Sequence, residues 1–321
     1  MQDALPRPSR EVSNRIEIPA RPVREIAREA LDDIDSSLER LIAWDVDVPP
    51  SSRLHQARDI LAAAADTGVL VPKHRGDLLG LRALELSFDY GAIADALPKQ
   101  RVAALGREIR DSLNGALDPP ETARGPLQLQ SQAVVCAAFV RGGLSPIHPT
   151  HSPKHGKSSP DLVLENGSER YAIEAKRPQA RKNIFPRFQD AHAQLLNYGL
   201  RGGVLIDVTD CLRDTPGDHL DREVRVIALE LYDRVFVSGQ GYRPGYSDLL
   251  VVGAYTRVAW NSEDRHNEAM VKVHTSSAID VFATTENNLN HHRAKWIRSR
   301  FQAGLERLSL TLEERSRGDA A

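Results

Sequence analysis

The chain has few cysteines, few aromatic residues and no long apolar run. Only Cys136 and Cys211 occur among its 321 residues, both within apolar stretches, so neither a disulfide framework nor a cysteine-based zinc site is expected. This cysteine usage predicts a reducing, cytoplasmic setting. The longest apolar run, residues 133–140, is far too short to cross a bilayer, and the first residues lack the apolar core of a secretory signal. We therefore expect no membrane partner.

The charges nearly cancel, which excludes a polycationic protein. There are 42 Lys and Arg residues against 44 Asp and Glu residues, a formal net charge of −2. Any affinity for nucleic acid must therefore come from local basic patches.

The first 120 residues divide into two parts. Residues 1–20 are polar and contain three prolines, which predicts a flexible leader. Residues 21–120 are predicted to form an α-helical domain, ended by the prolines of segment 118–120. Apolar side chains recur there at three- and four-residue spacing, as one helical stripe: Ile26, Ala30, Ile34, Leu38 and Leu41. Such helices could bind a second copy of the chain or a partner subunit.

Residues 121–321 alternate between helical and strand patterns. The expected order is a helix at 126–141, a hairpin around 166–167, a helix at 186–198, a buried strand at 202–210, a helix at 220–237, strands at 247–259 and 270–274, and a helix at 291–315. This order predicts an α/β fold with a mixed β-sheet flanked by helices, preceded by the α-helical N-terminal region.

The hairpin contains an unusual charged strand face. Residues 171–176 alternate with period two, so Glu174 and Lys176 share one face. Asn166-Gly167 is a strong signal for a two-residue turn, and a turn centred there pairs residue 165 with 168 and Asp161 with Ala172. Asp161 and Glu174 would then be diagonal neighbours, roughly 7–8 Å apart at the backbone.

Two acids and a lysine in this arrangement suit phosphodiester hydrolysis. Two carboxylates can hold Mg²⁺ or Mn²⁺, which prefer oxygen ligands. Lys176 could orient or deprotonate an attacking water and stabilise developing negative charge. The alternative is a solvated Glu-x-Lys pair at the edge of a sheet.

The sequence Pro160-Asp161, followed by Glu174-Ala175-Lys176, resembles the PD-(D/E)XK nuclease superfamily over about residues 126–260. The resemblance implies a restriction-endonuclease-like fold and a metal-dependent nuclease, with DNA expected ahead of RNA and restriction or defence as a common setting. Asp161 and Glu174 would bind metal, the backbone carbonyl of Ala175 would be a further ligand, and Lys176 would be catalytic. Gln194 and Tyr198 resemble the Q-x-x-x-Y element of some members.

One position departs from the family pattern. Many members carry a glutamate ligand on the preceding helix, whereas this helix offers only glutamines, of which Gln132 is the expected counterpart. A neutral amide binds Mg²⁺ less strongly than a carboxylate. This departure keeps open a different class of protein, a non-cleaving nucleic-acid-binding or scaffold subunit.

Several nearby residues are candidate contacts to nucleic acid. Arg177, Arg181 and Lys182 belong to a basic stretch after the strand and could bind phosphates, or could form a solvated loop. Gln194 and Tyr198 lie one helical turn apart and face either the site or the sheet.

Overall fold

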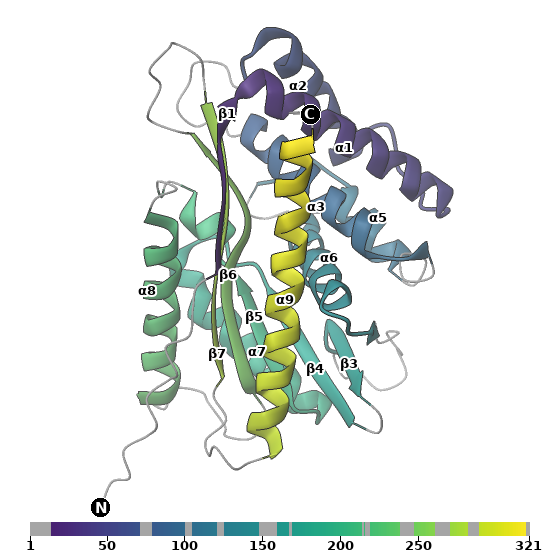
Figure 1. Cartoon of the computed structure of the whole chain (residues 1–321). Helices are drawn as coiled ribbons and strands as arrows, with labels where there is room; N and C mark the ends of the chain where they lie inside the picture. Colours follow the sequence, from purple (N-terminus) through teal and green to yellow (C-terminus); the bar gives the residue numbers. More distant parts are fainter. Residues whose placement is uncertain are drawn as a thin grey trace, which may run out of the picture.

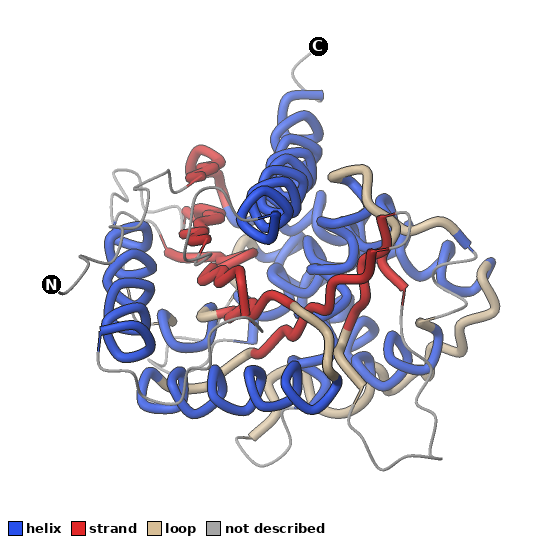
Figure 2. Tube along the Cα trace, turned by 90° about the horizontal axis from the view of Figure 1, so that it is seen from below, coloured by secondary structure: helices blue, strands red, loops and turns tan. Residues whose placement is uncertain are grey.

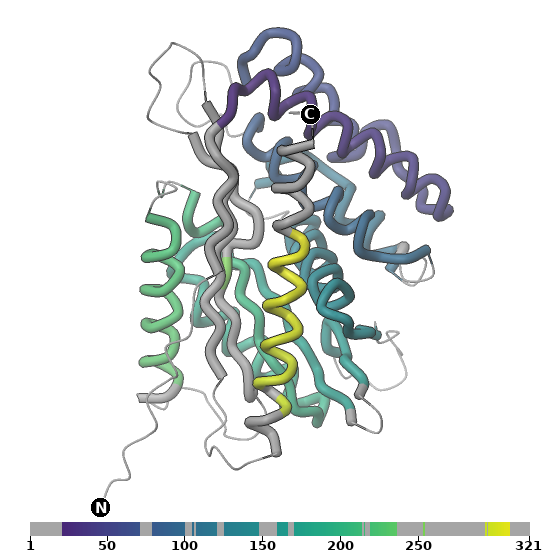
Figure 3. Tube along the Cα trace, in the orientation of Figure 1, coloured from purple at the N-terminus to yellow at the C-terminus, as the bar shows by residue number. Residues whose placement is uncertain are grey.

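The structure is a computed structural model. It describes residues 14–70, 79–99, 105–120, 125–147, 159–166, 169–213, 215, 219–237, 247–260, 270–281 and 289–318. Figure 3 traces the chain from the N-terminal helices to the long C-terminal helix.

The strands form a seven-stranded mixed sheet in the order β1-β7-β6-β5-β4-β3-β2 (Figure 1). Their bounds are β1 Asn14–Pro22, β2 Pro146–Ile147, β3 Leu162–Asn166, β4 Glu169–Lys176, β5 Gly202–Asp207, β6 Ser247–Trp260 and β7 Met270–Val281. Neighbours β4, β5 and β6 are parallel, and all other pairs are antiparallel. The carboxyl ends of the three parallel strands therefore meet at one edge of the sheet.

Helices cover both faces of this sheet (Figure 2). They are α1 Val23–Ala43, α2 Arg53–Thr67, α3 Leu79–Ala96, α5 Gly106–Leu113, α6 Gly125–Arg141, α7 Ile184–Tyr198, α8 Leu220–Tyr232 and α9 Leu289–Gly318. The segments between them include the short helical turns η2 Arg181–Asn183, η3 Thr209–Leu212 and η5 Asp233–Val237. This arrangement confirms the predicted mixed α/β fold with N-terminal helices.

Strand alternation explains which helices lie on which face. Ile173 and Ala175 of β4 belong to a buried cluster with α3, α6 and α9, whereas Ala172 belongs to a second cluster with α7 and α8. Successive side chains of a strand point to opposite faces, so Glu174 and Lys176 share the α7 side with Ala172. Every residue of β5 is buried, which confirms the predicted strand with two covered faces.

The N-terminal helices pack onto the sheet. The whole predicted stripe on α1 is buried, as expected, and it lies in the same cluster as residues of β3, β4 and α9. Residues 21–120 and 121–321 therefore share a core, and the predicted boundary near residue 120 does not divide two cores. The prediction of a flexible leader is also wrong for residues 14–20, because they lie in β1, which pairs with β7. Residues 1–13 lie outside the described part.

The hairpin register differs from the prediction by two residues. Asn166 pairs with Glu169 and Val163 pairs with Ala172, so the turn lies one residue later than the Asn-Gly signal indicated. The connecting residues, 167 and 168, are outside the described part. A shift of two residues keeps every side chain on its face, because the side-chain period of a strand is two. Asp161 and Glu174 therefore remain on one side, and Asp161 moves from a diagonal towards a directly opposed position.

Candidate functional site

The structure brings Asp161, Glu174 and Lys176 together at the carboxyl end of β4. Lys176 Nζ lies 2.7 Å from Glu174 Oε2 and 3.7 Å from Asp161 Oδ2. The Glu174 side chain is 1% exposed, while those of Lys176 and Asp161 are 12% and 17% exposed. The site is therefore an acidic pair around one ammonium, nearly closed on the Glu174 side and open on the Asp161 side.

Burial and neighbouring charges change the pKa values of Glu174 and Lys176, and both are raised. Burial, together with the neighbouring Asp161 carboxylate, raises the pKa of Glu174 to about 8 against the opposing effect of Lys176. Burial lowers the pKa of Lys176, but attraction to Asp161 and Glu174 outweighs it, so the net change is upwards. Near neutral pH, Lys176 therefore holds its proton, and Glu174 is the acid that is costly to ionise.

The donor set fits a small divalent cation. Glu174 Oε1 is buried and has no hydrogen-bond partner among the described residues. Such an atom is costly unless something pairs with it. Within the described part, no three acidic, histidine or cysteine side chains converge as a metal site. Mg²⁺ usually needs only one or two carboxylates, with water and substrate phosphate supplying other ligands, so Asp161 and Glu174 are the residues that could hold one.

Side chains continue the hydrogen-bond ladder of β4 where β3 ends. The N–H of Ala175 donates to Asp161 Oδ2 at 2.8 Å. Gln128 of α6 donates from Nε2 to the Ala175 carbonyl at 2.5 Å and accepts at Oε1 from the Arg177 N–H at 2.7 Å. The backbone on both sides of Lys176 is thus held by α6. Gln132, the expected counterpart of the family's glutamate, lies one turn further along α6 than Gln128.

A cleft of about 560 Å³ opens beside Lys176. It is lined by Gly125, Gln128, Gln132, Lys176, Arg177, Gln179, Arg187, Asp190, Ala193 and Gln194. Gln132 and Gln194 both reach it, from α6 and α7. Tyr198 is half-buried on α7 and is not among the lining residues, so of the predicted pair Gln194 lines this cleft.

The prediction that Arg177 contacts phosphate is wrong for this arrangement. Its side chain is 4% exposed, and its Nε lies 3.0 Å from Asp210 Oδ2, with Asp207 nearby. Arg177 is the first residue after β4, and these carboxylates neutralise its guanidinium.

Arg181 and Lys182 lie in a different place from the cleft. Arg181 pairs with Glu223 and Glu230 of α8. Together with Lys182 it lines a separate pocket of about 230 Å³ between α7 and α8. Contacts from these two residues to a phosphate beside Lys176 are therefore not supported by the geometry.

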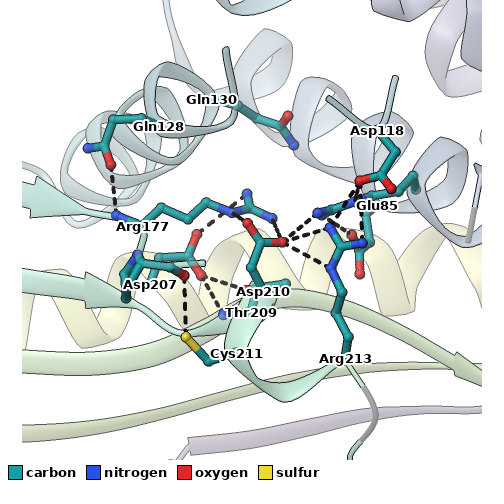
Figure 4. Close-up of polar contacts among 12 residues, drawn as sticks. Glu85, Asp118, Gln128, Gln130, Arg177, Asp207, Thr209, Asp210, Cys211 and Arg213 are labelled. Carbon is teal, nitrogen blue, oxygen red and sulfur yellow. Dashed lines mark hydrogen bonds and ion pairs between the residues drawn. The ribbon is translucent and has the colours of Figure 1, made fainter. Parts of the chain in front are cut away.

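The buried partner of Arg177 was missed by sequence reasoning (Figure 4). Asp210 of η3 accepts hydrogen bonds from Arg82 of α3, from Arg177 and from Arg213. This cluster joins the N-terminal helices to the carboxyl ends of β4 and β5. One of its members, Arg177, is the residue that follows Lys176. The available signal was the pair of aspartates, Asp207 and Asp210, at the end of an otherwise apolar strand.

Comparison of the chain with family models, with curated proteins and with solved structures finds no match. Among the described helices, none combines the length and apolar character needed to cross a membrane.

Proposed function

We propose that this protein is a metal-dependent nuclease of the PD-(D/E)XK type, with a restriction-endonuclease-like fold, that hydrolyses phosphodiester bonds of nucleic acid, DNA ahead of RNA. The observation that carries the proposal is Glu174. Its carboxylate is buried beside a second acid, with one oxygen on Lys176 and the other without a partner among the described residues. An unpaired buried oxygen is costly and adds nothing to a structural ion pair, whereas it is available to a metal ion.

Each residue of the trio has a separate task in this proposal. Asp161 and Glu174 would hold Mg²⁺ or Mn²⁺, which when bound supplies positive charge for the scissile phosphate and activates water. Lys176 keeps its proton near neutral pH, so it acts by donating to and neutralising negative charge that develops on the phosphate. The protonation of Lys176 favours this electrostatic role over proton abstraction from water.

The topology supports the same proposal. An antiparallel hairpin, β3–β4, is followed by a helix and then by the parallel strand β5, with helices on both faces. The trio lies where β3 and β4 separate, so the end of the hairpin leaves room for a substrate.

A second candidate function is a nucleic-acid-binding or scaffold subunit that does not cleave. The observation that favours it is Gln128, whose Nε2 donates to the Ala175 carbonyl, the group that the resemblance gives as a further metal ligand.

One assay separates the two. Purified protein is incubated with labelled DNA and RNA, single- and double-stranded, with Mg²⁺, Mn²⁺ or a chelator. A nuclease cleaves only with metal, and Lys176→Ala lowers the rate by roughly 10²–10³-fold, the range for removing one group that stabilises developing negative charge. Lys182→Ala, at an exposed lysine outside the cleft, is the control and retains the rate. Binding without cleavage by wild type under every metal condition selects the subunit instead.

A further inference from the structure

The cleft beside Lys176 is lined by an unusual number of amide side chains. Four glutamines from three parts of the chain reach it: Gln128 and Gln132 from α6, Gln179 after β4, and Gln194 from α7. Its volume, about 560 Å³, lies within the range of pockets that bind one small ligand. The lining therefore provides hydrogen-bonding groups around a space for one compact group.

The charges of the cleft do not suit a run of phosphates. Lys176 is held by Glu174 and Asp161, and Arg177 is held by Asp207 and Asp210. The remaining cation of the lining, Arg187, lies 3.5 Å from Asp190, which lines the same cleft. Each lining cation thus has a carboxylate partner, so electrostatic attraction to a polyanion is weak within the cleft.

Two of the glutamines that line the cleft have amide atoms without a hydrogen-bond partner among the described residues. Gln128 uses both ends of its amide on β4. Gln132 is half-buried and makes no hydrogen bond with another described residue, and Gln194 Oε1 is buried with no partner in the described part. An amide offers donors and an acceptor together. A nucleobase edge presents the complementary mixture, whereas a phosphate presents acceptors only.

We infer that this cleft binds one unstacked nucleobase, read at its edge by Gln132 and Gln194, while the adjoining phosphate lies at Lys176. A base inside a duplex is covered by its stacked neighbours and cannot enter such a space without leaving the helix. The preferred substrate is therefore a single strand or a locally opened duplex. The position of the phosphate rests on the proposed function, but binding of the base does not.

Measuring the affinity for nucleic acid without metal tests the proposed base site separately from cleavage. Fluorescence anisotropy is measured in chelator with a short labelled single strand, with the same strand lacking one base, and with the matching duplex. Wild type should bind the intact strand most tightly. The double variant Gln132→Ala/Gln194→Ala should bind the intact strand about tenfold more weakly, in line with the discrimination of a good amide–base pair, and the abasic strand unchanged.

Two controls keep the result interpretable. Gln189→Ala replaces an exposed glutamine of the same helix, α7, outside the cleft, and should leave all three affinities unchanged. The single variant Gln132→Ala, at a half-buried position, provides the same comparison if the double variant unfolds.

Equal affinity of the wild type for intact and abasic strands would overturn the inference. An equal loss of affinity for both strands in the double variant would overturn it as well. Adding Mg²⁺ to the same strands tests the nuclease on its own. A preference for the intact strand without cleavage keeps the base site and rejects the nuclease. Cleavage without that preference supports the nuclease and rejects the base site.

Discussion

Gln128 occupies the place of a neighbouring strand beside Arg177. Its Oε1 accepts from the Arg177 N–H at 2.7 Å, and its Nε2 donates to the Ala175 carbonyl. In an antiparallel ladder these two backbone groups, two residues apart, would pair with two different residues of the next strand. Since β3 does not extend this far, one side chain of α6 makes both bonds and holds the peptide units on either side of Lys176.

Gln128→Ala should free these backbone groups without removing any charge. We expect hydrogen exchange of the Arg177 amide to become at least several-fold faster, because its acceptor is lost. Cleavage should fall as well, since Lys176 is less firmly positioned. Amide exchange of the metal-free protein, followed residue by residue, checks the first effect without reference to activity.

Gln132→Ala is the matched control for that measurement, one turn further along the same helix. It should leave the Arg177 amide protected. Unchanged exchange in Gln128→Ala would show that the helix does not hold the strand end.

Gln128→Glu should strengthen metal binding. A carboxylate at residue 128 can still accept from the Arg177 N–H, but it cannot donate to Ala175, and it adds a third acid near Asp161 and Glu174. Additional ligand charge raises affinity for hard cations, and we expect about tenfold tighter Mg²⁺ or Mn²⁺ binding by calorimetry. Gln132→Glu is the comparison. A larger gain in metal affinity from Gln132→Glu would show that Gln132, the residue favoured by the sequence pattern, is the counterpart of the family's glutamate ligand.

Local patterns predicted the parts of this site that depend on chain geometry alone. Strand alternation placed Glu174 and Lys176 on one face, and the turn signal placed Asp161 near them. The register was wrong by two residues, but a two-residue shift preserves the face, so the three side chains still meet. The helical stripe on α1 was predicted for the same reason, because helix periodicity is also local.

Long-range pairing was outside the reach of such patterns. Arg177 directly follows Lys176 in the sequence, yet its partner Asp210 is 33 residues further along the chain. Arg82, the second partner of Asp210, is 128 residues away. β1 joins the sheet through its pairing with β7, which lies far along the sequence. No spacing rule links residues so far apart.

Asp210→Asn should destabilise the fold strongly. The asparagine oxygen can still accept one hydrogen bond, but Arg82 and Arg177 would be left buried with less countercharge. Breaking a buried ion pair by removing one partner costs about 3–5 kcal/mol. Urea unfolding measures the loss. Asp35→Asn, which breaks the exposed Arg58–Asp35 pair, is the control and should change stability little. Equal effects of the two substitutions would contradict a structural role for the buried cluster.

Glu85→Gln should remove a pH dependence of stability. Burial raises the pKa of Glu85 to about 7, although Arg82 and Arg177 act in the opposite direction. The folded protein therefore keeps a proton on Glu85 that the unfolded chain releases near its ordinary pKa of 4.5. Where the folded state binds more protons, the free energy of unfolding falls as pH rises, and this fall ends at about pH 7.

From pH 5 to pH 8 the free energy of unfolding of the wild type should consequently fall relative to that of Glu85→Gln. The variant therefore gains stability relative to the wild type over this range. The ceiling is about 3 kcal/mol, since each unit of pKa shift corresponds to about 1.4 kcal/mol. The amide oxygen that the substitution introduces can still accept from Arg82, which lies 2.9 Å from Glu85 Oε2 in the wild type, so the contact itself is largely kept. Urea titrations at pH 5, 6, 7 and 8 in chelator follow the difference. Glu39→Gln, at an exposed position of α1, is the control for the general effect of losing a carboxylate. A difference that stays constant across these pH values would mean that Glu85 is ionised in the folded protein throughout, stabilised by Arg82 and Arg177 more than burial opposes it.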